Sequence, residues 1–108
     1  MNTSKMKDIV FESLIDIKAV DPIAIDVQKL SSMTDYMLIA SGTSNRHIQA
    51  ISERVIDGLK FNKIKPVRVE GSIGDDWILV DAWDVIVHLM TSQARDFYDL
   101  EGLWDPDL

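Results

Sequence analysis

Apolar residues recur at two different periods along the chain, and the first period is helical. Near the start they are three or four positions apart, at Met6, Ile9, Val10, Leu14 and Ile17. Such spacing predicts an amphipathic helix. Thr3 or Ser4 is the expected N-cap. Asp21-Pro22 is the expected stop, because proline disfavours helical geometry in the residue before it.

A second helix is predicted after residues 41–44, a tight turn that offers Thr43 or Ser44 as the cap. Its apolar stripe consists of Ile48, Ile51, Val55, Ile56 and Leu59. Near its C-terminal end follow Lys60, Lys63 and Lys65. Cations at that end suit the helix dipole. Pro66 then prevents continuation of the helix.

Shorter apolar segments predict five strands. Residues 23–27 alternate in polarity, and the continuous apolar run 36–40 suits a central strand covered on both faces. Further strands are expected at 67–69, 77–80 and 85–90. Between the last two lies Asp81-Ala82-Trp83-Asp84, which predicts a tight hairpin. Neither Ala82 nor Trp83 easily adopts the positive φ that two-residue hairpin turns need.

A third, short helix is predicted near the end of the chain, with Thr91 or Ser92 as its cap and Phe97, Tyr98 and Leu100 on it. The order is therefore helix, two strands, helix, three strands, helix. A helix between strands favours an α/β fold with a mixed five-stranded sheet flanked by helices. The 108 residues are expected to form a single domain, residues 1–108.

The absence of cysteine and of long apolar runs indicates where in the cell the protein is expected. The sequence has no cysteine, whereas a small secreted domain often depends on disulfides. No apolar run approaches the roughly 18 residues that span a bilayer. The N-terminus also lacks the apolar stretch of a signal peptide. We therefore expect a cytoplasmic protein with no membrane partner.

The net charge of −7 is unevenly spread. Residues 1–69 hold ten basic and eight acidic residues, whereas residues 70–108 hold ten acidic residues and a single base, Arg95. This acidic C-terminal third is either a solvated surface or one that steers toward a cationic partner. Direct or sequence-specific binding of nucleic acid is disfavoured, because phosphate contacts need clustered lysines and arginines.

Candidate catalytic chemistry is sparse. Residues 42–44 form a helix N-terminus that could hold an anion, but they lack the glycine-rich phosphate-loop pattern and its lysine. Glu53 and Asp57 have the spacing of a solvated helix face rather than of a magnesium site. The two histidines, His47 and His88, have no nucleophile or cysteine beside them in the pattern. We expect no catalytic residue, no metal and no cofactor.

The aromatic residues gather where the acids do. All three tryptophans, Trp77, Trp83 and Trp104, fall in the acidic third, together with Phe97 and Tyr98. Each ring alone is more often part of a core. Rigid rings are also the preferred anchors of protein interfaces, where they fill a pocket. Their concentration in one acidic segment favours an interface.

Several stretches recur in the same order in one known family, over about residues 5–104. They are Thr34-Asp35-Tyr36, Ser41 to His47, Glu70-Gly71, Trp77 to Asp81, Asp84 to His88, Arg95, and Phe97 to Glu101 with Leu103-Trp104. The chain resembles the ribosomal silencing factor S family, also called the Iojap or YbeB family. At the hairpin it departs from the family, which usually has glycine in place of Trp83 and tyrosine or leucine in place of Ala82.

The resemblance implies a nucleotidyltransferase-like fold without enzymatic activity. It also implies binding to the large ribosomal subunit through ribosomal protein L-fourteen at the intersubunit face. Such binding blocks joining of the small subunit and represses translation when nutrients are scarce, as in stationary phase. The alternatives are a small nucleotide-binding or nucleotidyltransferase enzyme, and a self-associating homodimer.

Complementary charge speeds encounter and fixes register, while buried rings supply more of the affinity. Because ribosomal proteins are generally basic, we expect the acidic third to carry the contacts. Arg95 is expected to hold this third together internally. The candidate partner contacts are Trp77, Asp81, His88, Met90, Tyr98 and Trp104.

Overall fold

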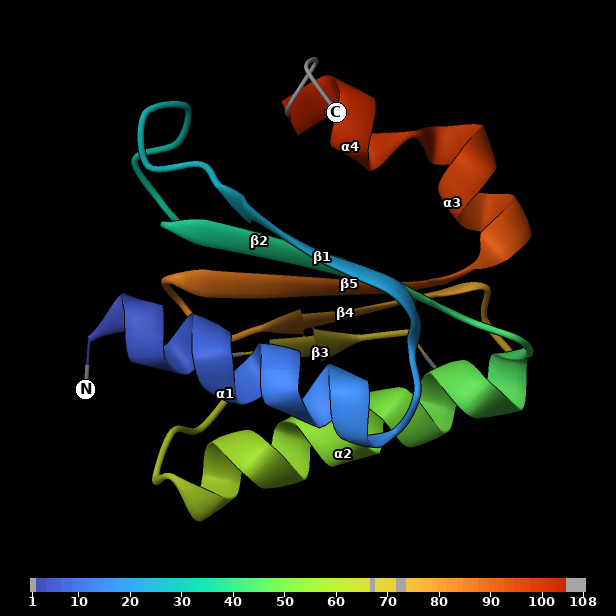
Figure 1. Ribbon diagram of the computed structural model, residues 1–108, viewed down its shortest axis with the longest axis horizontal. Helices are drawn as coiled ribbons and strands as arrows, with labels where there is room; N and C mark the ends of the chain where they lie inside the picture. The colour runs from blue at the N-terminus through green and yellow to red at the C-terminus, as the bar shows by residue number, and fades with distance from the viewer. Residues whose placement is uncertain (1, 67, 72–73, 105–108) are drawn as a thin grey trace.

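A mixed sheet lies between two layers of helix (Figure 1). The structure is a computed structural model and describes residues 2–66, 68–71 and 74–104. Within these residues the elements are α1 (Thr3–Asp16), β1 (Val20–Asp26), β2 (Tyr36–Gly42), α2 (Asn45–Phe61), β3 (Arg68–Glu70), β4 (Trp77–Asp81), β5 (Val85–Thr91), α3 (Ser92–Tyr98) and α4 (Leu100–Trp104). Figure 1 shows α1 and α2 packed together on one face of the sheet and α3 and α4 over the other.

The strand order across the sheet is β1-β2-β5-β4-β3. The strands β2 and β5 run parallel, from the pair Tyr36 and Val85 to the pair Gly42 and Thr91. The remaining neighbours are antiparallel. The prediction of an α/β fold with a mixed five-stranded sheet flanked by helices is therefore confirmed for the described residues.

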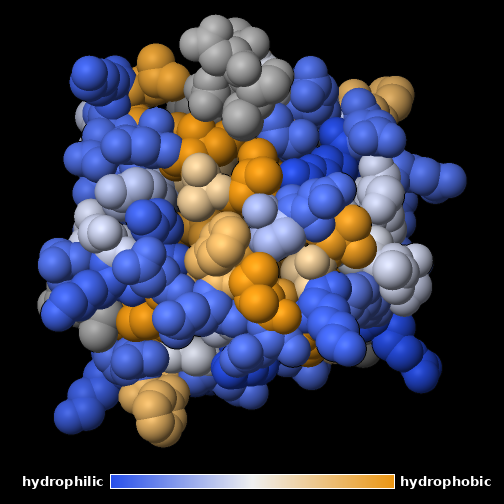
Figure 2. Space-filling model, viewed as in Figure 1, coloured by the Kyte–Doolittle hydropathy of each residue, from blue (hydrophilic) through white to orange (hydrophobic). Residues whose placement is uncertain are grey.

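Alternation along the strands sends side chains to both faces of the sheet. The larger core lies under α1 and α2, and its fully buried members include Val10, Leu14, Leu38, Ile48, Ile51, Val55, Leu59, Val87 and Leu89. The smaller core lies under α3 and consists of Ile25, Val27, Met37, Ile39, Met90 and Ala94. Figure 2 shows apolar side chains gathered in the middle of the face it views, over the edge strand β1, with hydrophilic ones around them.

The first helix begins and ends earlier than its sequence pattern predicts. Its N-cap is Asn2, whose Oδ1 accepts a hydrogen bond from the backbone N–H of Lys5 at 2.8 Å, and not Thr3 or Ser4. The helix stops at Asp16. The predicted stop, Asp21-Pro22, was wrong, because both residues lie inside β1, at a register shift. An edge strand tolerates proline there, since an N–H on its open side has no ladder partner.

The second helix and its cap are confirmed, with corrections at both ends. Ser44 caps α2, because its Oγ accepts from the N–H of His47 at 3.1 Å. Residues 41–42 belong to β2 rather than to a turn. The helix stops at Phe61, well before Pro66. Val67, placed in the third predicted strand, lies outside the described residues, and β3 covers only Arg68–Glu70.

The predicted final helix is two short helices. Thr91 caps α3, as expected, and its Oγ1 accepts from the N–H of Ala94 at 3.2 Å. Asp99 then adopts a left-handed conformation with φ 46°. This conformation breaks the helical path, so that Leu100 opens α4 instead of extending α3. No helix within the described ranges is long and apolar enough to cross a membrane.

The predicted hairpin between β4 and β5 is confirmed. Trp83 supplies the positive φ, 67°, although its side chain disfavours that region. The Oδ1 of Asp81 accepts from the N–H of Trp83 at 3.0 Å, and the N–H of Ala82 donates to the carbonyl of Val85 at 2.9 Å. These bonds hold the turn closed, with Ala82 buried and the Trp83 indole 70% exposed.

Candidate functional site

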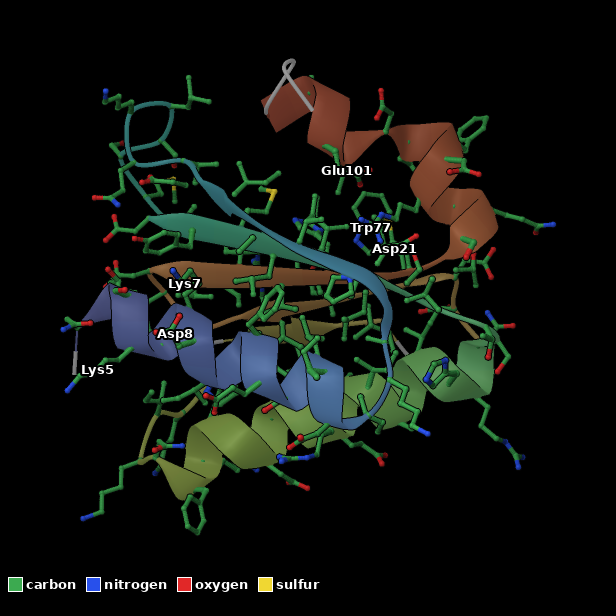
Figure 3. The ribbon with its side chains drawn as sticks, in the orientation of Figure 1. Lys5, Lys7, Asp8, Asp21, Trp77 and Glu101 are labelled. Carbon is green, nitrogen blue, oxygen red and sulfur yellow. The ribbon has the colours of Figure 1, made fainter. Side chains whose placement is uncertain are left out.

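Four rings meet where α3 crosses the start of β4, and we call Trp77, His88, Phe97 and Tyr98 the aromatic cluster. Trp77 lies between the sheet and α3 (Figure 3). Its ring centroid is 4.8 Å from that of Tyr98 and 5.5 Å from that of His88, in both cases tilted. Phe97 and Tyr98 meet edge to face with centroids 5.1 Å apart. Such tilted and edge-to-face arrangements are favourable for aromatic pairs.

The outer rings of the aromatic cluster are open to solvent. Phe97 is 81% exposed and Tyr98 52% exposed, whereas Trp77 is half-buried. Beside them lies a hollow of about 590 Å³, lined by Asp75, Asp76, Trp77, Gln93, Ala94, Phe97 and Tyr98. A contiguous apolar patch with a polar rim is typical of a protein interaction site.

Asp75 and Asp76 form the acidic rim of this hollow. Asn45, the first residue of α2, ties the rim down. Its Nδ2 donates to the Oδ1 of Asp76 at 2.7 Å and to the carbonyl of Asp75 at 2.9 Å. Asn45, Asp76 and Phe97 were not among the predicted contact residues, although Phe97 belongs to the aromatic residues whose concentration favoured an interface. Asn45 follows the cap Ser44 directly, which was the available signal that it lies at an exposed helix start.

His88 is a buried support for Trp77. The indole Nε1–H donates to its Nδ1 at 2.9 Å, so the imidazole is neutral and carries its proton on Nε2. Burial lowers the pKa of His88 from 6.5 to about 4. The hydrogen bond and the burial together account for a lone histidine in an apolar strand. His88 fixes the orientation of the indole and is only 8% exposed.

The other predicted contacts occupy different depths. Met90 pairs with Trp77 across the two strands and is fully buried, so it supports the aromatic cluster from below and does not line the surface. Asp81 shares a strand face with Trp77 but lies four residues along β4, about 13 Å away at strand spacing. There it faces Arg68, with 3.9 Å between Arg68 Nη2 and Asp81 Oδ2. Trp104 ends α4, and its side chain lies outside what the structure describes.

Arg95 holds the last two helices on the sheet. Its Nε donates to Glu101 Oε1 on α4 at 3.1 Å, and its Nη1 donates to the carbonyl of Val20 and to Ser41 Oγ, both at 3.2 Å. Glu101 points toward the sheet from α4 (Figure 3). The predicted internal role of Arg95 is confirmed, because the residue is 9% exposed and links α3 to α4, β1 and β2.

The geometry around Gly42 explains its glycine without a ligand. A Cβ there would lie 2.9 Å from Ile48 Cγ1, so the glycine permits close packing of α2 on β2. The N–H of Thr43, which an anion at this helix start would use, donates to His47 Nδ1 at 2.9 Å. Across the described residues, no three histidine, cysteine, aspartate or glutamate side chains converge as a metal site requires. The candidate site is therefore the surface formed by the aromatic cluster and its acidic rim, Asp75 and Asp76.

Comparison with known proteins gives the family. Residues 1–107 match the family described as "Ribosomal silencing factor during starvation". The chain is 40% identical to "Ribosomal silencing factor RsfS" of Chromobacterium violaceum, over 96% of this chain and 85% of that protein. It is 36% identical to the Bacillus subtilis protein of the same name, over 96% and 88% of the two chains.

A more distant relative and two solved structures agree. "Mitochondrial assembly of ribosomal large subunit protein 1" of Mus musculus is 36% identical over 90% of this chain and 44% of that protein. A crystal structure from Chromobacterium violaceum has a TM-score of 0.93 at 40% identity, covering 96% of this chain and 87% of that one. Another, from Bacillus halodurans, has a TM-score of 0.85 at 29% identity, covering 94% and 95%.

The fold therefore agrees with the sequence matches. The predicted resemblance is confirmed over nearly the whole length of the chain. By its sequence and by its fold, this chain belongs to the ribosomal silencing factor family, a family of ribosome-associated regulators.

Proposed function

We propose that this chain, acting in the cytoplasm as one domain, binds the large ribosomal subunit through the aromatic cluster and its acidic rim. The contacted protein is ribosomal protein L-fourteen at the intersubunit face. Occupation of that face keeps the small subunit from joining and represses translation when nutrients are scarce. The chain works by steric exclusion and not as an enzyme.

The observation that carries this proposal is the exposure of Phe97 and Tyr98 in this chain. The chain belongs to a family of ribosomal silencing factors, which suggests what these rings would contact. Tyr98, 52% exposed, packs on a half-buried tryptophan that is fixed by its own hydrogen bond, and Phe97, 81% exposed, packs edge to face on Tyr98. Pre-ordered rings lose little rotamer freedom on binding, so more of their burial contributes to affinity. This is the arrangement expected of interface anchors.

Charge supports a basic partner. Asp75 and Asp76 stand at the rim of the hollow, and Asp96 is exposed on α3 beside the rings. A basic ribosomal protein would be drawn to this edge and held in register by it. The rings would then exclude water from the centre of the contact.

Sedimentation in sucrose gradients tests the proposal. Purified small and large subunits are mixed with an excess of wild-type protein, and formation of 70S ribosomes is expected to fall. Tyr98→Ala and Phe97→Ala are expected to restore it, since each removes an exposed ring without opening the core. Binding to isolated L-fourteen is expected to weaken at least tenfold in the same variants, the general size of an interface hot spot.

Ile15→Ala is the matched control, because Ile15 is a large apolar residue, 54% exposed, on α1 behind the other face of the sheet. It is expected to silence like wild type. Unchanged 70S formation with excess wild-type protein would sink the proposal. If silencing survives in Tyr98→Ala and Phe97→Ala but fails in Ile15→Ala, the contact lies on the face covered by α1 and not at the aromatic cluster, and the proposal is overturned.

Two alternatives have their own measurements. Titration with nucleoside triphosphate and magnesium tests a nucleotide-binding enzyme, and the His47 imidazole on the Thr43 N–H argues against a phosphate there. Light scattering tests a homodimer, for which the edge strand β1 and the apolar surface around it in Figure 2 are the available face.

A further inference from the structure

The carboxyl end of α2 carries a concentration of positive charge that the proposed contact does not use. Residues 58–69 contain Lys60, Lys63, Lys65 and Arg68 and no acidic residue. Lys60, Lys63 and Lys65 line one surface hollow of about 620 Å³ together with Pro66. We call these three lysines and the adjacent Phe61 the basic tip.

The lysines of the basic tip are available for a partner. Arg68 differs from them, because its Nε lies 3.2 Å from Glu70 Oε1 and its Nη2 lies 3.9 Å from Asp81 Oδ2. Among the described residues no carboxylate pairs with Lys60, Lys63 or Lys65. Unpaired neighbouring cations repel one another, so an anion placed between them is stabilised.

Capping of α2 does not require the lysines. The N–H of Lys63 donates to the carbonyl of Lys60 at 2.9 Å, and that of Ile64 donates to the carbonyl of Leu59 at 2.8 Å. Asn62 Nδ2 donates to the carbonyl of Gly58 at 2.8 Å. Backbone and amide donors therefore satisfy the last carbonyls, in the usual arrangement around a left-handed residue, here Lys63 with φ 64°.

The basic tip also contains an aromatic ring, that of Phe61, which follows Lys60 in the chain. It is the last residue of α2 and is 88% exposed, more than either outer ring of the aromatic cluster. It does not line the lysine hollow but a neighbouring groove, with Arg54 and with the carboxylates of Glu12, Asp16 and Asp57, which repel phosphate. An anionic chain would therefore lie on the lysine side of the ring. Lysines beside an exposed aromatic ring suit single-stranded nucleic acid, in which unpaired bases stack and phosphates follow a basic path.

We infer that the basic tip is a second contact surface, which holds an unpaired stretch of ribosomal RNA without reading its sequence. The lysines contact phosphates, and Phe61 stacks on a base. This inference rests on the proposed function, which brings the protein to a surface rich in RNA. In Figure 1 the carboxyl end of α2 lies at the opposite end of the molecule from α3, so the two contacts do not compete for one place.

A charge-matched pair of variants tests the inference on purified large subunits. Lys63→Glu/Lys65→Glu removes two cations from the basic tip. Lys18→Glu/Lys29→Glu makes the same charge change elsewhere, and Lys18 matches Lys63 closely. It follows α1 as Lys63 follows α2, with φ 58°, and its N–H donates to the carbonyl of Ile15 at 3.0 Å. Circular dichroism melts of both variants check that they fold alike.

Affinity is measured across a range of salt concentrations. For Lys63→Glu/Lys65→Glu the slope of log K against log salt is expected to flatten by about 1.4, at about 0.7 for each phosphate contact on a single strand. The control pair keeps the wild-type slope. Phe61→Ala is expected to weaken binding at least about fivefold with the slope unchanged, because it removes stacking and no charge. Ultraviolet cross-linking to the subunit is expected to join RNA to the peptide that contains Phe61.

The outcomes separate this inference from the proposed function. If wild type binds large subunits and the two double variants have equal affinities and slopes, the basic tip is not a contact, while the proposed function stands. If wild type does not bind at all, both fail. Binding to phosphatidylglycerol vesicles that is lost in Lys63→Glu/Lys65→Glu, with subunit binding unchanged, would assign the basic tip to a membrane and overturn the RNA contact.

Discussion

A histidine inside a sheet needs a partner, and His88 has Trp77. The indole N–H donates to His88 Nδ1 at 2.9 Å, which is possible only while that nitrogen is unprotonated. Protonation would charge a buried ring and set two N–H donors against each other. The hydrogen bond and the burial therefore act in the same direction, and both keep the imidazole neutral in the folded protein.

We predict that the stability of the protein falls with pH below about 6.5 because of His88. Burial lowers the pKa from 6.5 to about 4 in the folded state, so the unfolded chain binds more protons in between. The stability is complete above 6.5 and is lost as pH falls toward 4. At 1.4 kcal/mol for each pH unit, the loss reaches about 3 kcal/mol. Urea unfolding followed by tryptophan fluorescence measures it.

His88→Gln is the control for this prediction, because a glutamine carbonyl can accept from the indole and does not titrate in this range. Its unfolding free energy is expected to vary less between pH 7 and pH 4.5 than that of wild type. Equal pH dependence in the two proteins would show that other groups cause the loss.

The predicted contact residues lie at different depths, with Tyr98 exposed and with His88 and Met90 buried beneath the rings. Strand alternation places Trp77, His88 and Met90 on one face, which was predictable. Whether that face is covered depends on where α3 returns, some fifteen residues after Trp77. A periodicity read along one strand holds no information about that packing. Met90 was therefore expected at the surface, although it is fully buried.

The turn between β4 and β5 gives a prediction about backbone strain. Trp83 adopts φ 67° and exposes 70% of its surface. Trp83→Gly is expected to stabilise the protein by about 1 kcal/mol, since a residue with a Cβ is disfavoured in the left-handed region. Thermal unfolding measures the change. A lower midpoint for Trp83→Gly would mean that indole packing outweighs the strain.

The buried Arg95 guanidinium links α3 and α4 to the sheet, and this gives a prediction for these helices. Arg95→Met is expected to destabilise the protein by about 2–3 kcal/mol, because Glu101 and Ser41 lose a charged partner in a nearly buried place. Hydrogen exchange is expected to accelerate in residues 92–104 more than in α2. Denaturant unfolding gives the free energy, and mass spectrometry locates the exchange.

Arg54→Met is the comparison. Its guanidinium lies 2.8 Å from Asp16 Oδ2 and joins α2 to α1, but the two side chains are 40% and 61% exposed. An exposed ion pair contributes under about 1 kcal/mol. If Arg95→Met and Arg54→Met lower the free energy of unfolding equally, the burial of Arg95 does not strengthen its hydrogen bonds.

The presence of a helix or strand was predictable wherever apolar residues recurred at a regular period. The residues at which the helices and strands begin and end were not predictable. The stripe of α2 and the continuous run of β2 gave both elements correctly. The stop of α1 was misassigned because proline breaks helices but also fits an edge strand. The pattern holds no sign that β1 would be at an edge. The division into α3 and α4 depends on one dihedral angle, at Asp99.

The two helical layers differ in how firmly they are held, which predicts an order of opening. The layer of α1 and α2 covers the larger core, whereas α3 and α4 are short and leave Phe97, Tyr98 and Leu103 exposed. We predict faster amide exchange in α3 and α4 than in α2 and β5 under native conditions. Hydrogen exchange mass spectrometry measures it, and equal protection in both layers would contradict the prediction.

The charge asymmetry of the sequence survives folding as two separate regions, the acidic rim near α3 and the basic tip at the end of α2. Charge counts alone predicted the first, whereas the lysines of the second were interpreted only as cations that suit the dipole of α2. The coordinates add that these lysines have no carboxylate partner among the described residues and that backbone donors satisfy the last carbonyls of α2. A count of charges indicates where a partner of opposite charge would bind. It does not indicate which charged side chains already form ion pairs within the protein.

The position of β5 in the sheet has a consequence for biosynthesis. This strand lies between β2 and β4, yet it is the last strand to be translated. Before β5 emerges from the exit tunnel, it cannot pair with β2 or with β4, so among the described residues no strand pairing connects the pair β1-β2 with the pair β3-β4. Long-range parallel pairing is slow as well. The nascent chain therefore cannot assemble the surface around Trp77 and Tyr98 until β5 and α3 have both been translated.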